Sequence, residues 1–279
     1  MHPVPVLCFP FAGAGASAFR RCQEYPSEVL RICPVQLPGR EERFDEEPYH
    51  DVVQAAADLL PDVLDLIDGN PRVALFGHSL GAVLGYEMAH QLTAIDGLTV
   101  VQLFVSGSPG PWTRRSRRAT GLSGDEFLGR VREFAGYTHP ALEHPELRDM
   151  LLPTLRADVA MHEDYLAPSA KPLDAPITSI RGTQDELVSA SEASEWAAAT
   201  SKGWRTVELP GSHMYLVDSP VELVRLMASV LGASVLGAGG LGADVLGAGG
   251  LGAEVAGAGV PGAGVLGAEM LGAEHPVGR

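Results

Sequence analysis

Residues 73–85 form an apolar run that enters Gly77-His78-Ser79-Leu80-Gly81 and continues into a pattern of small residues typical of a helix. A strand, a sharp turn and a helix in this order predict a nucleophile elbow, which exposes a serine hydroxyl at the end of a strand. The two glycines leave room for the strand and the helix to approach closely. Ser79 is therefore a candidate nucleophile. The alternative is an ordinary loop serine, because the same pentapeptide also arises by chance in a chain with 33 glycines.

Strand-like and helix-like segments alternate on both sides of this elbow. Helical periodicity covers residues 48–67 and 191–199, and short apolar runs typical of strands occupy residues 4–9, 30–37, 99–105, 175–180 and 206–209. Such alternation predicts an α/β fold, with a mostly parallel sheet covered by helices on both faces. Residues 112–166 break the rhythm with helical patterns at 123–134 and 145–165. We expect this insertion to be a lid beside the active end of the sheet.

The sequence divides into a globular domain at residues 1–230 and a repetitive tail at residues 231–279. The tail repeats with a period of five, and each unit carries Gly and Ala at its second and third positions. No large side chains are available there to build a core, so a flexible appendage without catalytic importance is expected. An elastin-like or assembly segment is the alternative.

Composition excludes several classes of partner. The net charge of −15 argues against nucleic acid as a partner. Three cysteines without metal-ligand spacing indicate a reducing compartment rather than a disulfide framework. No segment reaches the roughly 18 consecutive apolar residues of a membrane span, and the N-terminus lacks a secretory pattern. We therefore expect a cytoplasmic protein that does not use a membrane as a partner.

A serine nucleophile on such a sheet requires an acid and then a base later in the chain, each after a strand. Asp185 follows the strand that ends near residue 180, and His213 follows the strand at 206–209. His213 would accept the Ser79 proton, and Asp185 would orient the imidazole and stabilise its charged form. Glu186 is the alternative acid.

An acyl-transfer site also needs hydrogen-bond donors for the developing oxyanion. We expect one donor to be the backbone N–H of Leu80. The other should come from the small-residue loop after the first strand, at Ala12 or Phe11. The alternative is a glycine-rich turn that only connects two elements.

Several motifs together carry a family resemblance across residues 4–230. These are Cys8-Phe9-Pro10-Phe11-Ala12-Gly13, Gln36-Leu37-Pro38-Gly39-Arg40-Glu41-Glu42-Arg43, the Ser79 elbow, Leu155-Arg156-Ala157-Asp158, Gly182 with Asp185, and Pro210-Gly211-Ser212-His213. With them the chain resembles the type II thioesterases of polyketide and non-ribosomal peptide assembly lines. Two departures are Ala14, where the family commonly has a second glycine, and the repetitive tail, which has no counterpart.

The resemblance implies an α/β-hydrolase fold and a triad of Ser79, Asp185 and His213. It further implies hydrolysis of acyl groups from the phosphopantetheine arm of an acyl or peptidyl carrier protein, an editing role that clears stalled modules. No metal or cofactor is expected, and the enzyme is expected to be a monomer. A carboxylesterase or lipase, a macrocyclising terminal domain and a non-catalytic interaction module are the alternatives.

One basic cluster stands out in this acidic chain, where the insertion leaves the sheet. It comprises Arg114, Arg115, Arg117 and Arg118. We expect it to contact the acidic carrier protein or the phosphate of its arm. A solvated loop is the alternative.

Overall fold

The computed structural model describes residues 2–115, 117–135, 142 and 144–237. Within these residues, six strands form one parallel sheet in the order β2-β1-β3-β4-β5-β6. The strands are β1 Val4–Phe9, β2 Leu30–Pro34, β3 Arg72–His78, β4 Thr99–Ser106, β5 Ile177–Gly182 and β6 Trp204–Leu209. The predicted fold class is confirmed. Because neighbouring strands are parallel, their carboxyl ends lie along one edge of the sheet.

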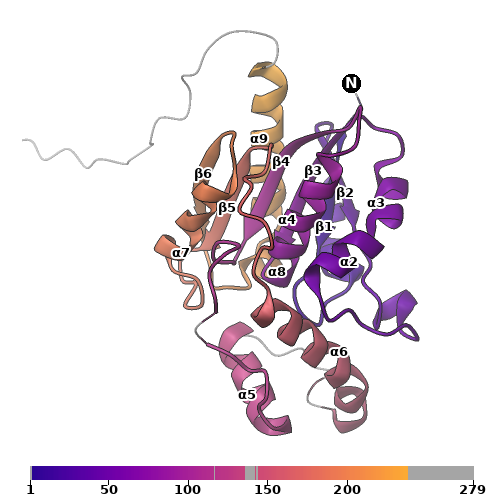
Figure 1. Cartoon of the computed structure of the whole chain (residues 1–279), viewed down its shortest axis with the longest axis vertical. Helices are drawn as coiled ribbons and strands as arrows, with labels where there is room; N and C mark the ends of the chain where they lie inside the picture. Colours follow the sequence, from indigo (N-terminus) through magenta and orange to yellow (C-terminus); the bar gives the residue numbers. More distant parts are fainter. Residues whose placement is uncertain (1, 116, 136–141, 143, 238–279) are drawn as a thin grey trace, which may run out of the picture. The chain divides into compact units, whose positions relative to one another are not determined.

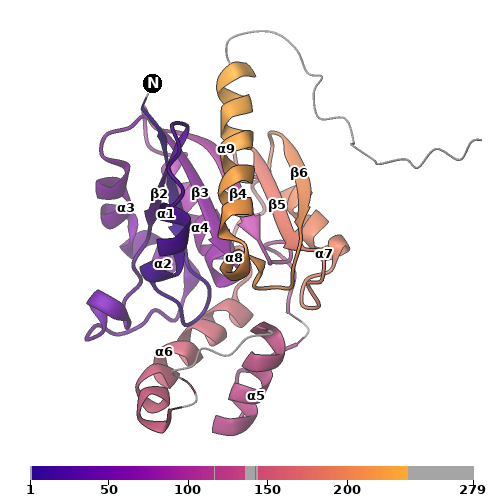
Figure 2. The same cartoon turned by 180° about the vertical axis from the view of Figure 1, so that it is seen from behind.

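Helices cover both faces of the sheet (Figures 1 and 2). One face carries α2 (Val52–Asp58), α3 (Leu60–Ile67) and α4 (Leu80–Leu92), and the other carries α1 (Arg20–Gln23), α8 (Tyr215–Asp218) and α9 (Pro220–Gly237). Strand β1 supplies both cores, since Leu7 and Phe9 pack on the first face and Val6 and Cys8 on the second. This division follows from the alternation of side chains along a strand.

Shorter elements complete the described fold. They are η1 (Ala16–Phe19), η2 (Glu41–Arg43), α7 (Ala190–Ser194) and η4 (Glu195–Ala199). The helix expected at residues 191–199 is thus divided between α7 and the 3₁₀ helix η4, whose Trp196 is fully buried in the core of the first face.

The single helix expected across residues 48–67 is two helices, α2 and α3, which meet at Leu59. Pro61 lies in the first turn of α3, where its missing N–H costs nothing. In a continuous helix the same proline would remove a hydrogen bond to the preceding turn. The apolar periodicity continues through this break, which is why the pattern alone indicated one helix.

The segment between β4 and β5 contains α5 (Gly124–Ala135) and α6 (Pro145–Asp164), and we call it the helical insertion. Both expected helices are confirmed, and they lie beyond the carboxyl ends of the strands (Figure 1). The insertion has an apolar cluster separate from the two cores of the sheet. The buried members of this cluster are Ala119, Phe127, Leu128, Leu155 and Val159.

Helix α9 extends past the domain end expected at residue 230. It continues to Gly237, and Leu231, the first residue of the repetitive segment, is fully buried. The expectation for the rest of the tail concerns residues 238–279, which lie outside the described residues. In the described part of the chain, no helix has both the length and the apolar character of a membrane span.

Candidate active site

Ser79 occupies a strained turn between β3 and α4. Its φ of 54° and ψ of −112° lie outside the regions that residues other than glycine prefer. Its N–H donates a hydrogen bond to the carbonyl of Ser106 over 2.8 Å, which ties the turn to the end of β4. A Cβ at Gly77 would lie 1.8 Å from the Gly81 carbonyl oxygen, and one at Gly81 would lie 2.1 Å from the Phe9 oxygen. Both positions therefore require glycine.

Asp185 and His213 meet at the same edge of the sheet. His213 Nδ1 is 2.9 Å from Asp185 Oδ2, and both residues are buried. The second carboxylate oxygen, Oδ1, accepts hydrogen bonds from the N–H groups of Leu187 and Val188 at 2.9 and 3.0 Å. Glu186, the alternative acid, is exposed. Among the described residues, Asp185 is thus the carboxylate that contacts the imidazole.

The surroundings of Asp185 keep it ionised. Burial raises its pKa, but the hydrogen bond and charge of His213, together with the N–H groups of Val188 and Leu187, lower it further than burial raises it. The net effect is a pKa below the ordinary value for aspartate. A carboxylate that stays charged can orient an imidazole and stabilise its protonated form.

Ser79 and His213 line one cavity at the carboxyl end of the sheet, together with apolar side chains of the insertion. The apolar lining includes Val131 of α5 and Leu155 and Val159 of α6. Among the described residues no hydrogen bond joins the Ser79 hydroxyl to His213. Hydrogen bonds between catalytic groups are often longer in free enzymes than in substrate complexes.

The backbone N–H groups that the sequence predicts as oxyanion donors belong to Leu80 and to Ala12 or Phe11. Leu80 is the first residue of α4, so its N–H has no acceptor within the helix. Phe11 and Ala12 line the cavity, and the Ala14 N–H closes a turn onto the Phe11 carbonyl over 3.0 Å. Gly13 N–H is already bonded to Asp158 Oδ2 at 2.7 Å. In the described part of the chain, the Ala12 N–H has no such partner.

A hydrogen-bonded group of buried polar side chains lies beside His213, and the sequence analysis did not predict it. The ring centroid of His78 lies 4.8 Å from that of His213. His78 Nδ1 is 2.9 Å from the Ser106 hydroxyl, which in turn is 2.6 Å from the hydroxyl of Tyr215. Gly107 lets His213 approach, since a Cβ there would lie 2.8 Å from its Cε1. The run of small residues directly after β4 is the sequence signal for this close approach.

The basic cluster divides into two groups. Arg114, Arg115 and Arg117 line the cavity, whereas Arg118 pairs with Asp164 and, over 3.5 Å, with Glu163. Arg115 also contacts the His162 ring and donates to the Ser108 hydroxyl over 3.2 Å. Burial lowers the pKa of Arg115 to about 10, so this side chain stays positively charged at neutral pH. The described residues contain no cluster of His, Cys, Asp and Glu able to hold a metal ion.

The family model described as Thioesterase domain matches residues 4–230. The chain belongs to the thioesterase family. The enzyme is therefore a serine hydrolase that acts on thioesters, as the sequence motifs indicated. The resemblance to type II thioesterases is also confirmed, because solved structures similar to this chain carry that description.

Two curated relatives cover most of this thioesterase. The gramicidin S biosynthesis protein GrsT of Aneurinibacillus migulanus is 31% identical over 227 residues, which are 81% of this chain and 88% of GrsT. Thioesterase PikA5 of Streptomyces venezuelae is 34% identical over 223 residues, which are 78% of this chain and 79% of PikA5.

Solved structures agree with this assignment. The RedJ thioesterase from the prodiginine biosynthetic pathway in Streptomyces coelicolor superposes with a TM-score of 0.73 at 31% identity, covering 82% of this chain and 85% of RedJ. YbtT, a type II thioesterase from the yersiniabactin NRPS/PKS biosynthetic pathway, has a TM-score of 0.73 at 26% identity, covering 84% of this chain and 94% of YbtT.

Two buried histidines should make the stability of this thioesterase sensitive to acid. Burial lowers the pKa of His78 and of His162 well below 6.5, and the charges of His213 and Arg115, respectively, lower them further. The unfolded chain takes up these protons near pH 6.5 and the folded chain does not, so stability is lost as pH falls below that value. We expect a loss of up to about 1.4 kcal/mol per pH unit for each histidine, measured by urea unfolding between pH 7.5 and 5.5.

A matched pair of variants isolates this effect. His162→Gln should flatten the dependence of unfolding free energy on pH, because it removes one buried group that resists protonation. His144→Gln should leave the dependence unchanged, since His144 is exposed. Equal slopes in wild type and His162→Gln would contradict the prediction.

Proposed function

We propose that this thioesterase hydrolyses acyl or peptidyl groups from the phosphopantetheine arm of carrier proteins, in an editing role in polyketide or non-ribosomal peptide biosynthesis. The observation that supports this most directly is that Ser79 and His213 line one cavity of a thioesterase-family fold, with His213 bonded to Asp185. Its relatives include a gramicidin S biosynthesis protein and the thioesterase PikA5, which supports the same class of pathway.

In the proposed reaction, the Ser79 hydroxyl attacks the thioester carbonyl carbon while His213 Nε2 takes the hydroxyl proton. The N–H groups of Leu80 and of Ala12, or else Phe11, stabilise the negative oxygen of the tetrahedral intermediate. The intermediate then collapses, the carbon–sulfur bond breaks, and the departing sulfur takes the proton from His213. The thiol of the arm leaves, and the acyl group stays bonded to Ser79. A thiolate leaving group needs little protonation, so attack and oxyanion stabilisation carry most of the barrier.

Water completes the cycle. His213 accepts a proton from water as the water oxygen attacks the acyl-enzyme, and the same proton returns to the Ser79 oxygen as the carboxylic acid departs. Asp185 keeps the imidazole in the tautomer whose Nε2 is free to accept a proton. The apolar side chains Val131, Leu155 and Val159 offer contact surface for the acyl chain.

The arginines at the cavity suggest how the carrier is recognised. We propose that Arg114, Arg115 and Arg117 attract the phosphate of the arm or the acidic surface of the carrier protein, since guanidinium groups bind phosphate and carboxylate strongly. Arg118 is included in the proposal for its charge, although it already pairs with Asp164 and Glu163.

Reversing these charges should separate carrier recognition from chemistry. With Arg114, Arg115, Arg117 and Arg118 all changed to Glu, we expect the rate on an acyl carrier protein to fall by at least about tenfold, because electrostatic steering and phosphate contacts are lost. The rate on the matching acyl-N-acetylcysteamine thioester, which lacks both phosphate and protein, should stay within about twofold. Initial rates on both substrates test this.

A variant with fewer changes distinguishes lost carrier recognition from a disturbed fold. Changing only Arg114 and Arg117 to Glu retains the contacts of Arg115 with Ser108 and His162 and the ion pairs of Arg118. Equal rates on the carrier substrate for wild type and both variants would refute the docking proposal.

The test of the proposed function is a substrate panel followed by mass spectrometry. Carrier-bound acyl chains from short to long are compared with p-nitrophenyl esters of equal chain length. We expect release of free acid from the carrier to be faster than ester hydrolysis. A preference for oxygen esters at every length would instead favour a general carboxylesterase.

A further inference from the structure

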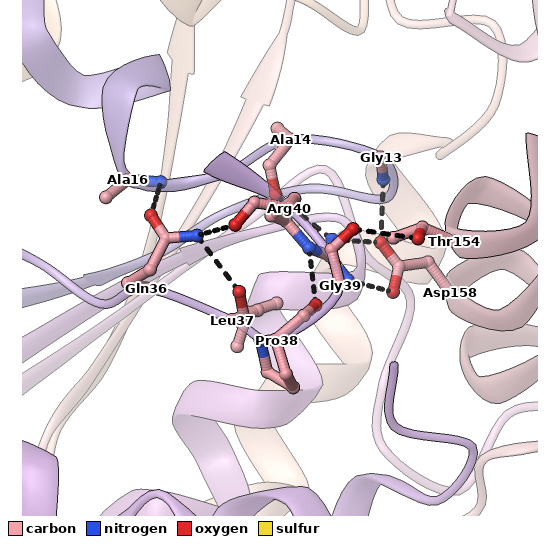
Figure 3. Close-up of polar contacts among 10 residues, drawn as sticks. All are labelled: Gly13, Ala14, Ala16, Gln36, Leu37, Pro38, Gly39, Arg40, Thr154 and Asp158. Atoms are coloured by element: carbon pink, nitrogen blue, oxygen red, sulfur yellow. Dashed lines mark hydrogen bonds and ion pairs between the residues drawn. The ribbon is translucent and has the colours of Figure 1, made fainter. Parts of the chain in front are cut away.

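A buried ion pair joins the loop after β2 to helix α6 of the insertion, and Figure 3 shows its surroundings. Arg40 Nη2 lies 2.9 Å from Asp158 Oδ1, and Nη1 contacts Oδ2, so the pairing is bidentate. Solvent reaches 5% of the Arg40 side chain and none of the Asp158 side chain. The proposed reaction assigns no role to either residue.

The pair also makes hydrogen bonds to the loop after β1, which carries the proposed oxyanion donor Ala12. Asp158 Oδ2 accepts the Gly13 N–H over 2.7 Å, and Arg40 Nη1 donates to the Ala14 carbonyl over 3.2 Å (Figure 3). These two bonds hold the residues that directly follow Ala12. We call the Arg40–Asp158 pair with its bonds to Gly13 and Ala14 the loop clamp.

Gly13 is also confined sterically from the side of the insertion. Its φ of 77° favours glycine, and a Cβ there would lie only 2.8 Å from Leu155 Cδ1. Leu155 is on α6 and lines the cavity, three residues before Asp158. The same helix therefore contacts this turn through an apolar side chain and through a carboxylate.

Arg40 is itself held by further hydrogen bonds within the loop after β2. Its Nε donates to the Pro38 carbonyl over 3.0 Å, and its own carbonyl accepts from Gln36 Nε2 over 3.1 Å. The side-chain oxygen of Gln36 accepts the Ala16 N–H over 3.0 Å, which returns the network to the loop after β1 (Figure 3). Such a connected polar network restricts the orientation of each member.

A buried ion pair of this kind contributes little net stability compared with well-packed apolar side chains, so stability alone does not explain it and another explanation is needed. Its position offers one. With Gly13 N–H held by Asp158, the next N–H toward the cavity is that of Ala12, and the orientation of the Ala12 peptide depends on how the turn is held. Arg40 also balances the charge of Asp158, which would otherwise oppose a developing oxyanion.

We propose that Arg40 and Asp158 are positioning residues that hold the Ala12 N–H in place to stabilise the oxyanion, and that the insertion contributes to catalysis through this clamp. The proposal rests on the proposed function, because it presupposes a tetrahedral intermediate at Ser79. It predicts a defect in stabilising the transition state rather than in binding substrate.

The experiment compares Asp158→Asn, the apolar double variant Arg40→Met with Asp158→Leu, and wild type. The double variant removes the clamp without leaving a buried unpaired charge, so it tests the proposal even if Asp158→Asn fails to fold. Thr154→Val is the matched control. Thr154 also joins α6 to the loop after β2, by donating to the Gly39 carbonyl, but it makes no hydrogen bond to Gly13 or Ala14 among the described residues. Circular dichroism and thermal unfolding establish that each variant is folded at the assay temperature.

Two readouts are taken with an acyl-N-acetylcysteamine thioester. In the clamp variants kcat should fall about 10- to 100-fold with KM within about twofold, a loss smaller than that for deleting a donor outright. The Ki of an acyl trifluoromethyl ketone, which forms a tetrahedral oxyanion adduct with a serine nucleophile, should rise by a similar factor. Thr154→Val should change neither.

The outcomes separate the two proposals. If wild type neither hydrolyses the thioester nor binds the ketone through Ser79, the proposed function fails and the clamp fails with it. If wild type does both and the folded clamp variants keep wild-type kcat and Ki, only the clamp is refuted. A change in KM alone, with ketone affinity unaltered, would also refute it, because that pattern indicates a role in substrate binding.

Discussion

Replacing Ser79 with alanine is expected to lower kcat by about 10⁴- to 10⁶-fold, leaving only the residual catalysis that the oxyanion donors and the cavity provide. The variant loses the atom that bonds to the acyl group, while the N–H groups of Leu80 and Ala12 and the cavity remain. KM should therefore change little. Initial rates on a carrier-bound acyl chain measure the loss, and intact-mass detection of a fluorophosphonate adduct reports directly on the nucleophile.

Ser191→Ala is the control for this experiment, since Ser191 is an exposed serine of α7 remote in sequence from the elbow. It should retain full turnover and form the adduct. A Ser79→Ala enzyme that still forms a covalent adduct, or retains more than about 1% of wild-type kcat, would mean that another residue is the nucleophile.

Changing Asp185 to asparagine is expected to lower kcat by about 10⁴-fold while leaving a measurable residual rate. The amide has nearly the shape of the carboxylate, but its NH₂ group can donate to Nδ1 and so favour the tautomer in which Nε2 carries the proton. That imidazole cannot accept the Ser79 proton. Single-turnover acylation, followed by mass, measures the step in which this defect appears.

Glu186→Gln makes the same chemical change at the neighbouring position and serves as the matched control. Glu186 is exposed, whereas Asp185 is bonded to His213 over 2.9 Å, so the control should keep its kcat within about twofold of wild type. The reverse ranking would show that the carboxylate of residue 186 orients the base.

The sheet could be predicted because its strands are short apolar runs and because strands that alternate with helices form parallel sheets. The apolar run at 4–9 coincides with β1, and the run at 99–105 ends one residue before β4 does. Residues distant in sequence, such as Asp185 and His213, could be placed together because parallel strands bring their carboxyl ends to one edge. The break at Leu59 could not be seen in the periodicity, since the apolar sides of α2 and α3 pack into the same core.

The contacts that the insertion makes could not be predicted from sequence patterns. Arg40 and Asp158 were visible only as parts of two separate motifs, and nothing in either motif indicates that the two side chains pair. The partner of Asp158 depends on where α6 crosses the sheet edge, which local periodicity does not encode. The division of the arginine cluster also depends on the position of α6, because Arg118 pairs with Glu163 and Asp164 of that helix.

The insertion has its own apolar cluster, centred on Phe127, Leu155 and Val159, apart from the cores of the sheet. This separation makes it a natural unit for chimaeras, in which the two helices of one thioesterase are grafted onto the scaffold of another to change acyl-chain preference. Such grafts must preserve the ion pair across the boundary, because Arg40 belongs to the scaffold and Asp158 to the graft. Exchanging the helices without matching both partners would leave a charged group buried alone at the junction.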